Sequence, residues 1–167
     1  LFFITLKELF IKKLNNISQI VAHFGFSLFI LSILFNSILS SEVITNIKIG
    51  EKYSYSKGEI FFKKIEEKKE SNFKSIIAYF EIKNQNGKTI ELNPEIRIYN
   101  QPNIITSEAD IKTTLLEDKF LVMNFVKGNE YFNIRYQIKP FMIWIWISVL
   151  LLGFGGSISL FKRKYEK

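Results

Sequence analysis

"VAHFGFSLFILSILFNSIL", residues 21–39, is an apolar stretch without a single charged side chain. Together with residues 17–20, it supplies the roughly 20 helical residues that cross a hydrocarbon core of about 30 Å. A second stretch, "FMIWIWISVLLLGFGGSISLF" at residues 141–161, also lacks ionisable groups. We therefore expect transmembrane helices at residues 17–40 and 140–161. A signal peptide is the weaker alternative for the first stretch, because the apolar run is long and no small-x-small cleavage site follows it.

The positive charge of the chain is concentrated at its two ends. The formal net charge is +7, yet residues 42–139 hold 16 Lys and Arg against 14 Asp and Glu. The excess lies in residues 1–16 and 162–167, which flank the two predicted helices. Short basic flanks stay on the cytoplasmic or matrix side, so the pattern predicts a multi-pass inner-membrane protein with both termini inside. The balanced middle segment offers no basic patch, and we expect no nucleic-acid partner.

This pattern divides the chain into five parts. Besides the two helices, we expect a cytoplasmic interfacial segment at residues 1–16, an external domain at residues 41–139 and a basic cytoplasmic tail at residues 162–167. The external domain is β-rich and lies on the periplasmic or intermembrane side. The predicted fold class is membrane α+β, in which two transmembrane helices in the lipid bilayer flank a small antiparallel β barrel or sandwich.

The external segment has the alternation and the turn residues of antiparallel strands. Residues 75–82 and 88–92 predict a hairpin, because the Asn86-Gly87 pair can supply the positive φ angles of a tight turn. Residues 127–129, Lys-Gly-Asn, predict a second hairpin turn. Further strand candidates, rich in β-branched and aromatic residues, are residues 43–49, 59–65, 95–99, 119–125 and 130–136.

Two stretches of the external segment suggest other structure. The charged run "EEKKES" at residues 66–71 predicts a solvated loop. Residues 106–116 favour a short helix, because "TSEAD" resembles an N-terminal cap followed by acidic first-turn residues.

The second apolar stretch has features of a helix that begins at the outer boundary and packs against a neighbour. Pro140 is compatible with a helix start, where no N–H is needed. Trp144 and Trp146 follow at the level where an indole can keep its N–H in water. Small-residue faces, which allow close helix approach, are present in Gly153-x-x-x-Ser157 and Gly155-x-x-x-Ser159.

His23 is the only histidine in the chain, and it falls inside the first predicted helix. An imidazole about 9 Å along that helix lies within hydrocarbon. Two interpretations remain open: the ring hydrogen-bonds to a neighbouring helix, or it ligates a metal or haem or relays protons. Ala22 and Gly25 remove bulk beside the ring, and Phe26 and Ile30 lie on its side of the helix at i+3 and i+7. With one histidine and no cysteine, this chain alone cannot form an imidazole or thiolate cluster.

Three blocks of the sequence resemble one protein family. The blocks are "AHFGFSLFILSI" (residues 22–33), "NPEIRIYNQPNIITSEADI" (residues 93–111) and "KPFMIWIWISVLLLGFGG" (residues 139–156). They resemble a late transmembrane helix, an element of the following external domain and the last span of CcmF, the haem lyase component of cytochrome c maturation. The blocks stand in the family's order and cover most of residues 20–167.

The resemblance implies a function in haem attachment. Proteins of this family receive haem from holo-CcmE and, with CcmH, join it to the CxxCH motif of apocytochrome c on the outer face of the membrane. They also hold a b-type haem between one histidine from each of two spans. By resemblance, His23 is the more C-terminal of these two ligands to the haem iron, so haem b would be shared with a histidine outside this chain.

Other parts of the family are missing from this sequence. The tryptophan-rich external loop, its two flanking histidines and the partner histidine of the b haem have no counterpart here. We therefore expect a C-terminal portion that works with the remaining N-terminal part of CcmF, is not competent alone and carries no catalytic residue. The external motif is matched by Glu95, Arg97, Tyr99 and Glu108.

The matched external residues have a structural interpretation as well as a functional one. An Arg–Glu pair and a Tyr would stabilise the β domain without touching a ligand. Ile96 stands where the family has a basic residue, which weakens a charge-based role for this stretch. The alternative function for the whole chain is a two-span membrane protein whose external β domain is a docking or assembly module without redox activity.

Overall fold

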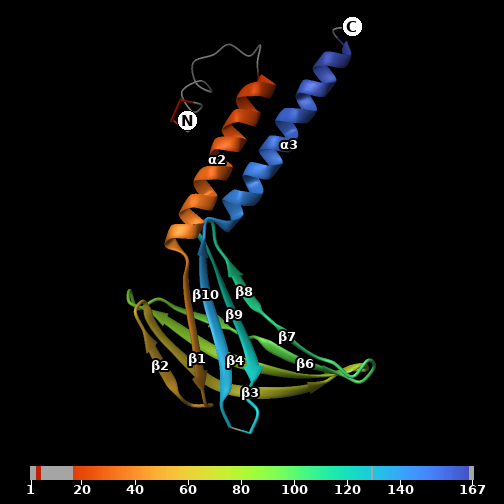
Figure 1. The fold of residues 1–167 in the computed structure, drawn as a ribbon. Helices are drawn as coiled ribbons and strands as arrows, with labels where there is room; N and C mark the ends of the chain where they lie inside the picture. The colour runs from red at the N-terminus through yellow and green to blue at the C-terminus, as the bar shows by residue number, and fades with distance from the viewer. Residues whose placement is uncertain (1–2, 5–16, 129, 166–167) are drawn as a thin grey trace. The chain divides into compact units, whose positions relative to one another are not determined.

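The structure is a computed structural model that describes residues 3–4, 17–128 and 130–165. It forms two compact units (Figure 1). One unit contains the two long helices and residues 114–118, and the other contains residues 41–113 and 119–138. Apart from residues 3 and 4, the predicted interfacial segment lies outside the described residues.

Helices α2 (Ile17–Leu39) and α3 (Met142–Tyr165) account for the two apolar stretches. Within the described residues, two stretches of helix are long and apolar enough to cross a membrane, at residues 17–39 and 142–160. Pro140 does not begin α3, because it is the last residue of a strand. The chain turns at Phe141, whose φ of 59° is uncommon for a residue with a side chain.

The turn at Phe141 is secured by contacts within the helical unit. The Asn36 side chain donates from Nδ2 to the Pro140 carbonyl at 2.6 Å. The rings of Phe35 and Phe141 lie with their centroids 5.3 Å apart. These contacts join the C-terminal end of α2 to the N-terminal end of α3 and offset part of the cost of the unusual backbone angle.

Helices α2 and α3 lie side by side (Figure 1). They are in close contact at small residues. A Cβ added at Gly155 would lie 2.7 Å from the backbone nitrogen of Ala22, and one added at Gly25 would lie 3.0 Å from Leu151 Cβ. Ser148 is fully buried and donates its hydroxyl to the Ile145 carbonyl at 2.6 Å. The helix backbones are therefore in contact at these positions, as expected of membrane helices that pack by van der Waals contact.

The second unit is built from two antiparallel sheets. The first has the order β1-β10-β9-β8, and the second has the order β2-β3-β4-β6-β7 with β5 paired to β4. The strands of the first sheet are β1 (Ser41–Ile47), β8 (Asp110–Thr113), β9 (Glu117–Phe125) and β10 (Phe132–Pro140). Those of the second are β2 (Lys52–Tyr55), β3 (Gly58–Lys69), β4 (Phe73–Asn84), β5 (Thr89–Leu92), β6 (Glu95–Tyr99) and β7 (Ile105–Glu108).

The inner faces of the two sheets share one hydrophobic core. Figure 1 shows the first sheet running across the strands of the second, as in a sandwich of crossed sheets. Phe62 stacks on Phe80 with ring centroids 4.3 Å apart, and it meets Phe132 of the other sheet edge-on at 5.6 Å. The core contains residues from both sheets, including Ile47, Ile60, Ile82, Ile96, Leu121, Met123 and Ile134. The β-sandwich form of the predicted external domain is therefore confirmed.

Three local predictions are wrong. Residues 106–116 form no helix, because residues 105–108 pair with β6 and residues 110–113 form β8. The first four residues of the charged run at 66–71 belong to β3, which continues to Lys69, and their side chains are exposed. In the β4–β5 turn only Gly87 takes a positive φ, 74°, and Asn86 does not. Residues 85–87 form a three-residue turn, because the Asn84 N–H donates to the Lys88 carbonyl at 3.0 Å, and such a turn needs one left-handed position.

The close packing of α2 against α3 can be tested by adding one methyl group at Gly155. Gly155→Ala places a Cβ against the Ala22 backbone, so α2 and α3 must separate, and we expect a loss of about 1–3 kcal/mol in unfolding free energy. Thermal unfolding of the detergent-solubilised chain, followed by circular dichroism, measures this. Gly156→Ala is the matched control, because a Cβ there meets nothing within 4 Å. Equal stability of the two variants would contradict the packing described here.

Candidate functional site

His23 lies on the face of α2 that does not contact α3. Its side chain is exposed, as are those of Phe26 (49%) and Ile30 (48%). Gly25 and Leu28, which lie between them in sequence, are buried. The helical spacing therefore groups the imidazole with two large apolar side chains, as the sequence predicted, and leaves this His23 face open in the described part of the chain.

The small residues beside His23 have a different role from the one predicted. Ala22 touches the position that a Cβ on Gly155 would occupy, and Gly25 is buried against Leu151 and Ser148. Both residues are used for packing against α3. They therefore do not make room beside the imidazole, and the space for any planar ligand must come from the opposite side of α2.

The hydroxyl nearest to His23 in sequence is already used within the helix. Ser27 is 3% exposed and donates its Oγ to the His23 carbonyl at 2.8 Å. This back-bonding within a helix satisfies the buried hydroxyl in a nonpolar setting. The donor of this hydroxyl is therefore used within α2.

The residues on the His23 face fit one side of a haem but not a complete site. A neutral imidazole is a common axial ligand of haem iron, and Phe26 and Ile30 offer an apolar surface for a porphyrin ring. A second axial histidine would have to come from elsewhere, because His23 is the only one in the sequence. No group of three or more His, Cys, Asp or Glu that could hold a metal ion occurs among the described residues.

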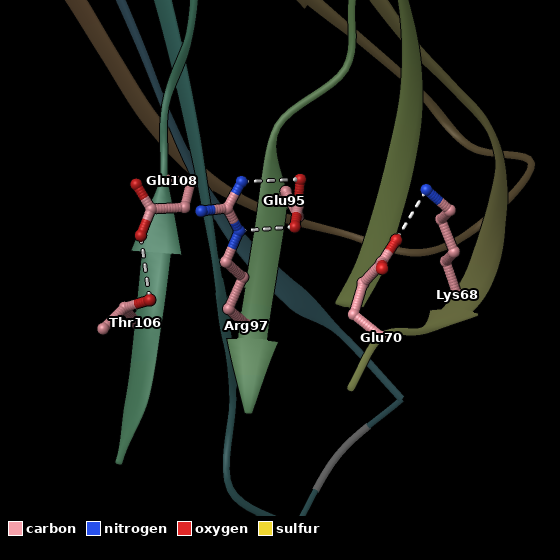
Figure 2. A network of polar contacts seen from close by, with 6 residues as sticks. All are labelled: Lys68, Glu70, Glu95, Arg97, Thr106 and Glu108. Carbon is pink, nitrogen blue, oxygen red and sulfur yellow. Dashed lines mark hydrogen bonds and ion pairs between the residues drawn. The ribbon is translucent and has the colours of Figure 1, made fainter. Parts of the chain in front are cut away.

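The residues of the external motif form a polar network on β6 and β7 (Figure 2). Arg97 donates to Glu95 through Nε at 2.6 Å and through Nη2 at 3.4 Å. Glu108 instead accepts from Thr106 Oγ1 at 2.9 Å. The predicted Arg–Glu pair is therefore confirmed, with Glu95 and Glu108 opposite each other across the two strands.

The network also involves aromatic packing. The Arg97 guanidinium lies 5.1 Å from the centre of the Phe73 ring, and Phe73 lies 5.2 Å from the ring of Tyr99.

The hydrogen bond from Arg97 holds the pKa of Glu95 below its ordinary value, and Glu95 in turn raises the pKa of Arg97. Both groups are thus charged at neutral pH and satisfy each other.

An open hollow of about 460 Å³ lies at the turn of the β3–β4 hairpin. Its charges are largely paired, because Lys68 contacts Glu70 at 2.7 Å and Lys74 contacts Glu67 at 2.7 Å. The hollow therefore offers no concentrated charge to a ligand. Its lining residues are Glu67, Lys68, Lys69, Phe73, Lys74 and Asn100.

Comparison with known proteins identifies relatives of this arrangement. A family described as CcmF C-terminal beta-sandwich matches residues 38–140. The cytochrome c-type biogenesis protein ccl1 of Rhodobacter capsulatus is 34% identical over 126 residues, which are 75% of this chain and 19% of that protein. CcmF of Pseudomonas fluorescens is 29% identical over 147 residues, covering 87% of this chain and 22% of its own length.

A solved structure has the same fold. The cytochrome c heme lyase CcmF aligns with a TM-score of 0.62 and 19% identity, over 83% of this chain and 23% of that chain. The chain thus spans only about a fifth of the length of these relatives. The matched family covers the whole sandwich and the segments that join it to α2 and α3, so the chain belongs to the CcmF family of cytochrome c biogenesis proteins and corresponds to its C-terminal part.

Proposed function

We propose that this chain is part of a membrane haem lyase for cytochrome c maturation, in which His23 is an axial ligand of a haem b within the membrane. Family membership supports the first part of this proposal. The single observation that carries the second is the position of His23 on the open face of α2, beside two exposed apolar side chains.

The energetics of the membrane favour a ligand on this imidazole. An ionisable side chain inside a bilayer is costly unless it faces another protein segment, a cavity or a cofactor. Gly25 packs against α3 on the other side of the helix, where Leu28 is also buried, so the ring faces away from α3. A haem held between His23 and a histidine of the remaining N-terminal part of CcmF would satisfy the ring and cover Phe26 and Ile30.

Each group on this face has a separate task in the proposal. When bound, the haem supplies one-electron redox chemistry. His23 would hold the iron, and its apolar neighbours Phe26 and Ile30 would exclude water from the porphyrin. The contact between Gly155 and Ala22 fixes the rotation of α2 about its axis and so holds the imidazole toward the ligand. The full reaction joins haem from holo-CcmE to apocytochrome c with CcmH as partner, in a multi-pass inner-membrane assembly with the sandwich on the periplasmic or intermembrane side.

The Glu95–Arg97 pair has a structural role in this proposal. Its carboxylate and guanidinium neutralise each other, and the cation lies against the Phe73 ring. Neither group is left free to take or give a proton near neutral pH. The pair therefore stabilises the β6–β7 edge of the sheet.

The assignment of His23 is tested by the haem spectrum of the assembled protein. When the chain is co-expressed with the remaining N-terminal part of CcmF, we expect a low-spin b-type spectrum that His23→Ala abolishes or strongly weakens, because one axial ligand is lost. Gln19→Ala is the matched control, since Gln19 is an exposed polar residue one turn earlier on the same helix. A spectrum unchanged by His23→Ala would refute the ligand assignment.

The structural role of the Glu95–Arg97 pair is tested by its pH dependence. Because the folded-state pKa of Glu95 is lowered, the pair stabilises the sandwich above the ordinary glutamate pKa of about 4.3, and this is lost as pH falls through the lowered value. Glu95→Gln should lower the free energy of unfolding by about 1 kcal/mol or less at pH 7. Below the lowered pKa of Glu95, the substitution should not change the free energy of unfolding.

Chemical denaturation at a series of pH values measures this difference. Glu130→Gln is the control, because its side chain is 88% exposed and its ion pair with Lys48 spans 3.4 Å. A Glu95→Gln deficit that persists unchanged below the lowered pKa would contradict the role assigned to the pair.

A further inference from the structure

The connection between β8 and β9 carries two exposed leucines at its tip. Leu115 is 67% exposed and Leu116 is 64% exposed. Such short connections ordinarily hold Gly, Asn, Asp, Ser or Pro, for conformational reasons and for contact with water. Neither leucine is buried in the helical unit to which the connection belongs. Their apolar surface therefore needs an explanation outside the packing of that unit.

Hydrogen bonds between the residues that flank the two leucines fix the backbone of the connection. The Thr114 N–H donates to the Glu117 carbonyl at 3.0 Å, and the Thr114 hydroxyl donates to the same carbonyl at 2.7 Å. The Glu117 N–H in turn donates to Thr114 Oγ1 at 3.1 Å. Thr114 and Glu117 are thus hydrogen-bonded to each other in both directions, and Leu115 and Leu116 form the tip between them.

This tip is attached to the first turn of α3. The Trp144 indole donates from Nε1 to the Leu115 carbonyl at 2.8 Å, and the Phe141 N–H donates to the Leu116 carbonyl at 2.8 Å. Residues 114–118 accordingly belong to the same compact unit as α2 and α3. The two leucines lie at the end of the candidate span where the chain enters it.

The surroundings of the tip have the character of a membrane interface. Tryptophan is enriched where a helix meets the headgroup region, and Trp146 on the same turn of α3 is 66% exposed. At the adjoining end of α2, Ile38 is 67% exposed. A bilayer that covers the apolar length of α3 would reach this level, and its boundary region accepts exposed leucines that water does not favour.

We propose that Leu115 and Leu116 insert into the boundary between headgroups and acyl chains of the outer leaflet. The occupant of this surface is the lipid bilayer. The tip acts as a second, shallow anchor, in addition to the two spans, and its backbone hydrogen bonds to α3 set its depth. This inference does not depend on haem binding, because the residues involved are remote in sequence from His23 and on a different element.

The sequence makes a direct test possible, because the chain contains no cysteine. Leu115→Cys and Leu116→Cys, each labelled with the polarity-sensitive fluorophore NBD, are reconstituted separately into phosphatidylcholine–phosphatidylglycerol vesicles. Each variant keeps the other leucine in place. Leu150→Cys, on an exposed position of α3, is the reference for lipid, and Asn86→Cys, in the polar β4–β5 turn, is the reference for water.

Quenching distinguishes insertion from exposure to water. We expect the labels at positions 115 and 116 to emit at shorter wavelength than the label at 86. They should be quenched by nitroxide lipids labelled near the glycerol backbone, and they should resist aqueous iodide as the label at 150 does. Iodide quenching as strong as at position 86 would overturn the proposal. Resistance to both quenchers would also overturn it, because it would mean that protein and not lipid covers the tip.

Discussion

The backbone contact between α2 and α3 determines which surface of α2 remains available. At Gly155 and Gly25 the two helices are so close that no side-chain carbon fits between them without movement. This contact fixes the rotation of α2 about its axis. Because residues that differ by two positions lie on different sides of a helix, burying Gly25 places His23 on an open side. The exposure of His23 on α2 therefore depends on the close packing of two glycines, Gly25 and Gly155, against the neighbouring helix.

The end of α3 shows how a strand can be joined directly to a membrane span. β10 runs to Pro140, Phe141 turns the chain in a left-handed conformation, and the helix begins at Met142. One residue, Phe141, separates the strand from the helix. The Pro140 carbonyl accepts from Asn36 and the Phe141 N–H donates to the Leu116 carbonyl, so both backbone groups at this corner are paired, as a site near lipid requires.

Features set by local composition were predictable from the sequence, and features set by distant pairing were not. The apolar length of both helices, the β6 strand and the position of the β4–β5 turn follow from residues within each segment. Thr106 and Glu108 have capping chemistry that favours a helix at residues 106–116, but the pairing of residues 105–108 with β6 makes this stretch a strand. The composition of residues 66–71 favours a loop, because the cross-strand contacts of Glu66 with Tyr79 and of Glu67 with Lys74 cannot be seen in one sequence. Likewise, the sequence suggests that Gly25 leaves room for a ligand, because it does not show which face of α2 is covered by α3.

We propose above that the open face of α2 holds haem iron against His23. An experimentally determined structure of the complete assembly, with the rest of the polypeptide present, tests it most directly. We expect a porphyrin lying over Phe26 and Ile30, with its iron bonded to a ring nitrogen of His23 and to a histidine of another span. An imidazole that contacts only acyl chains or a neighbouring hydroxyl, with no porphyrin beside it, would contradict the account.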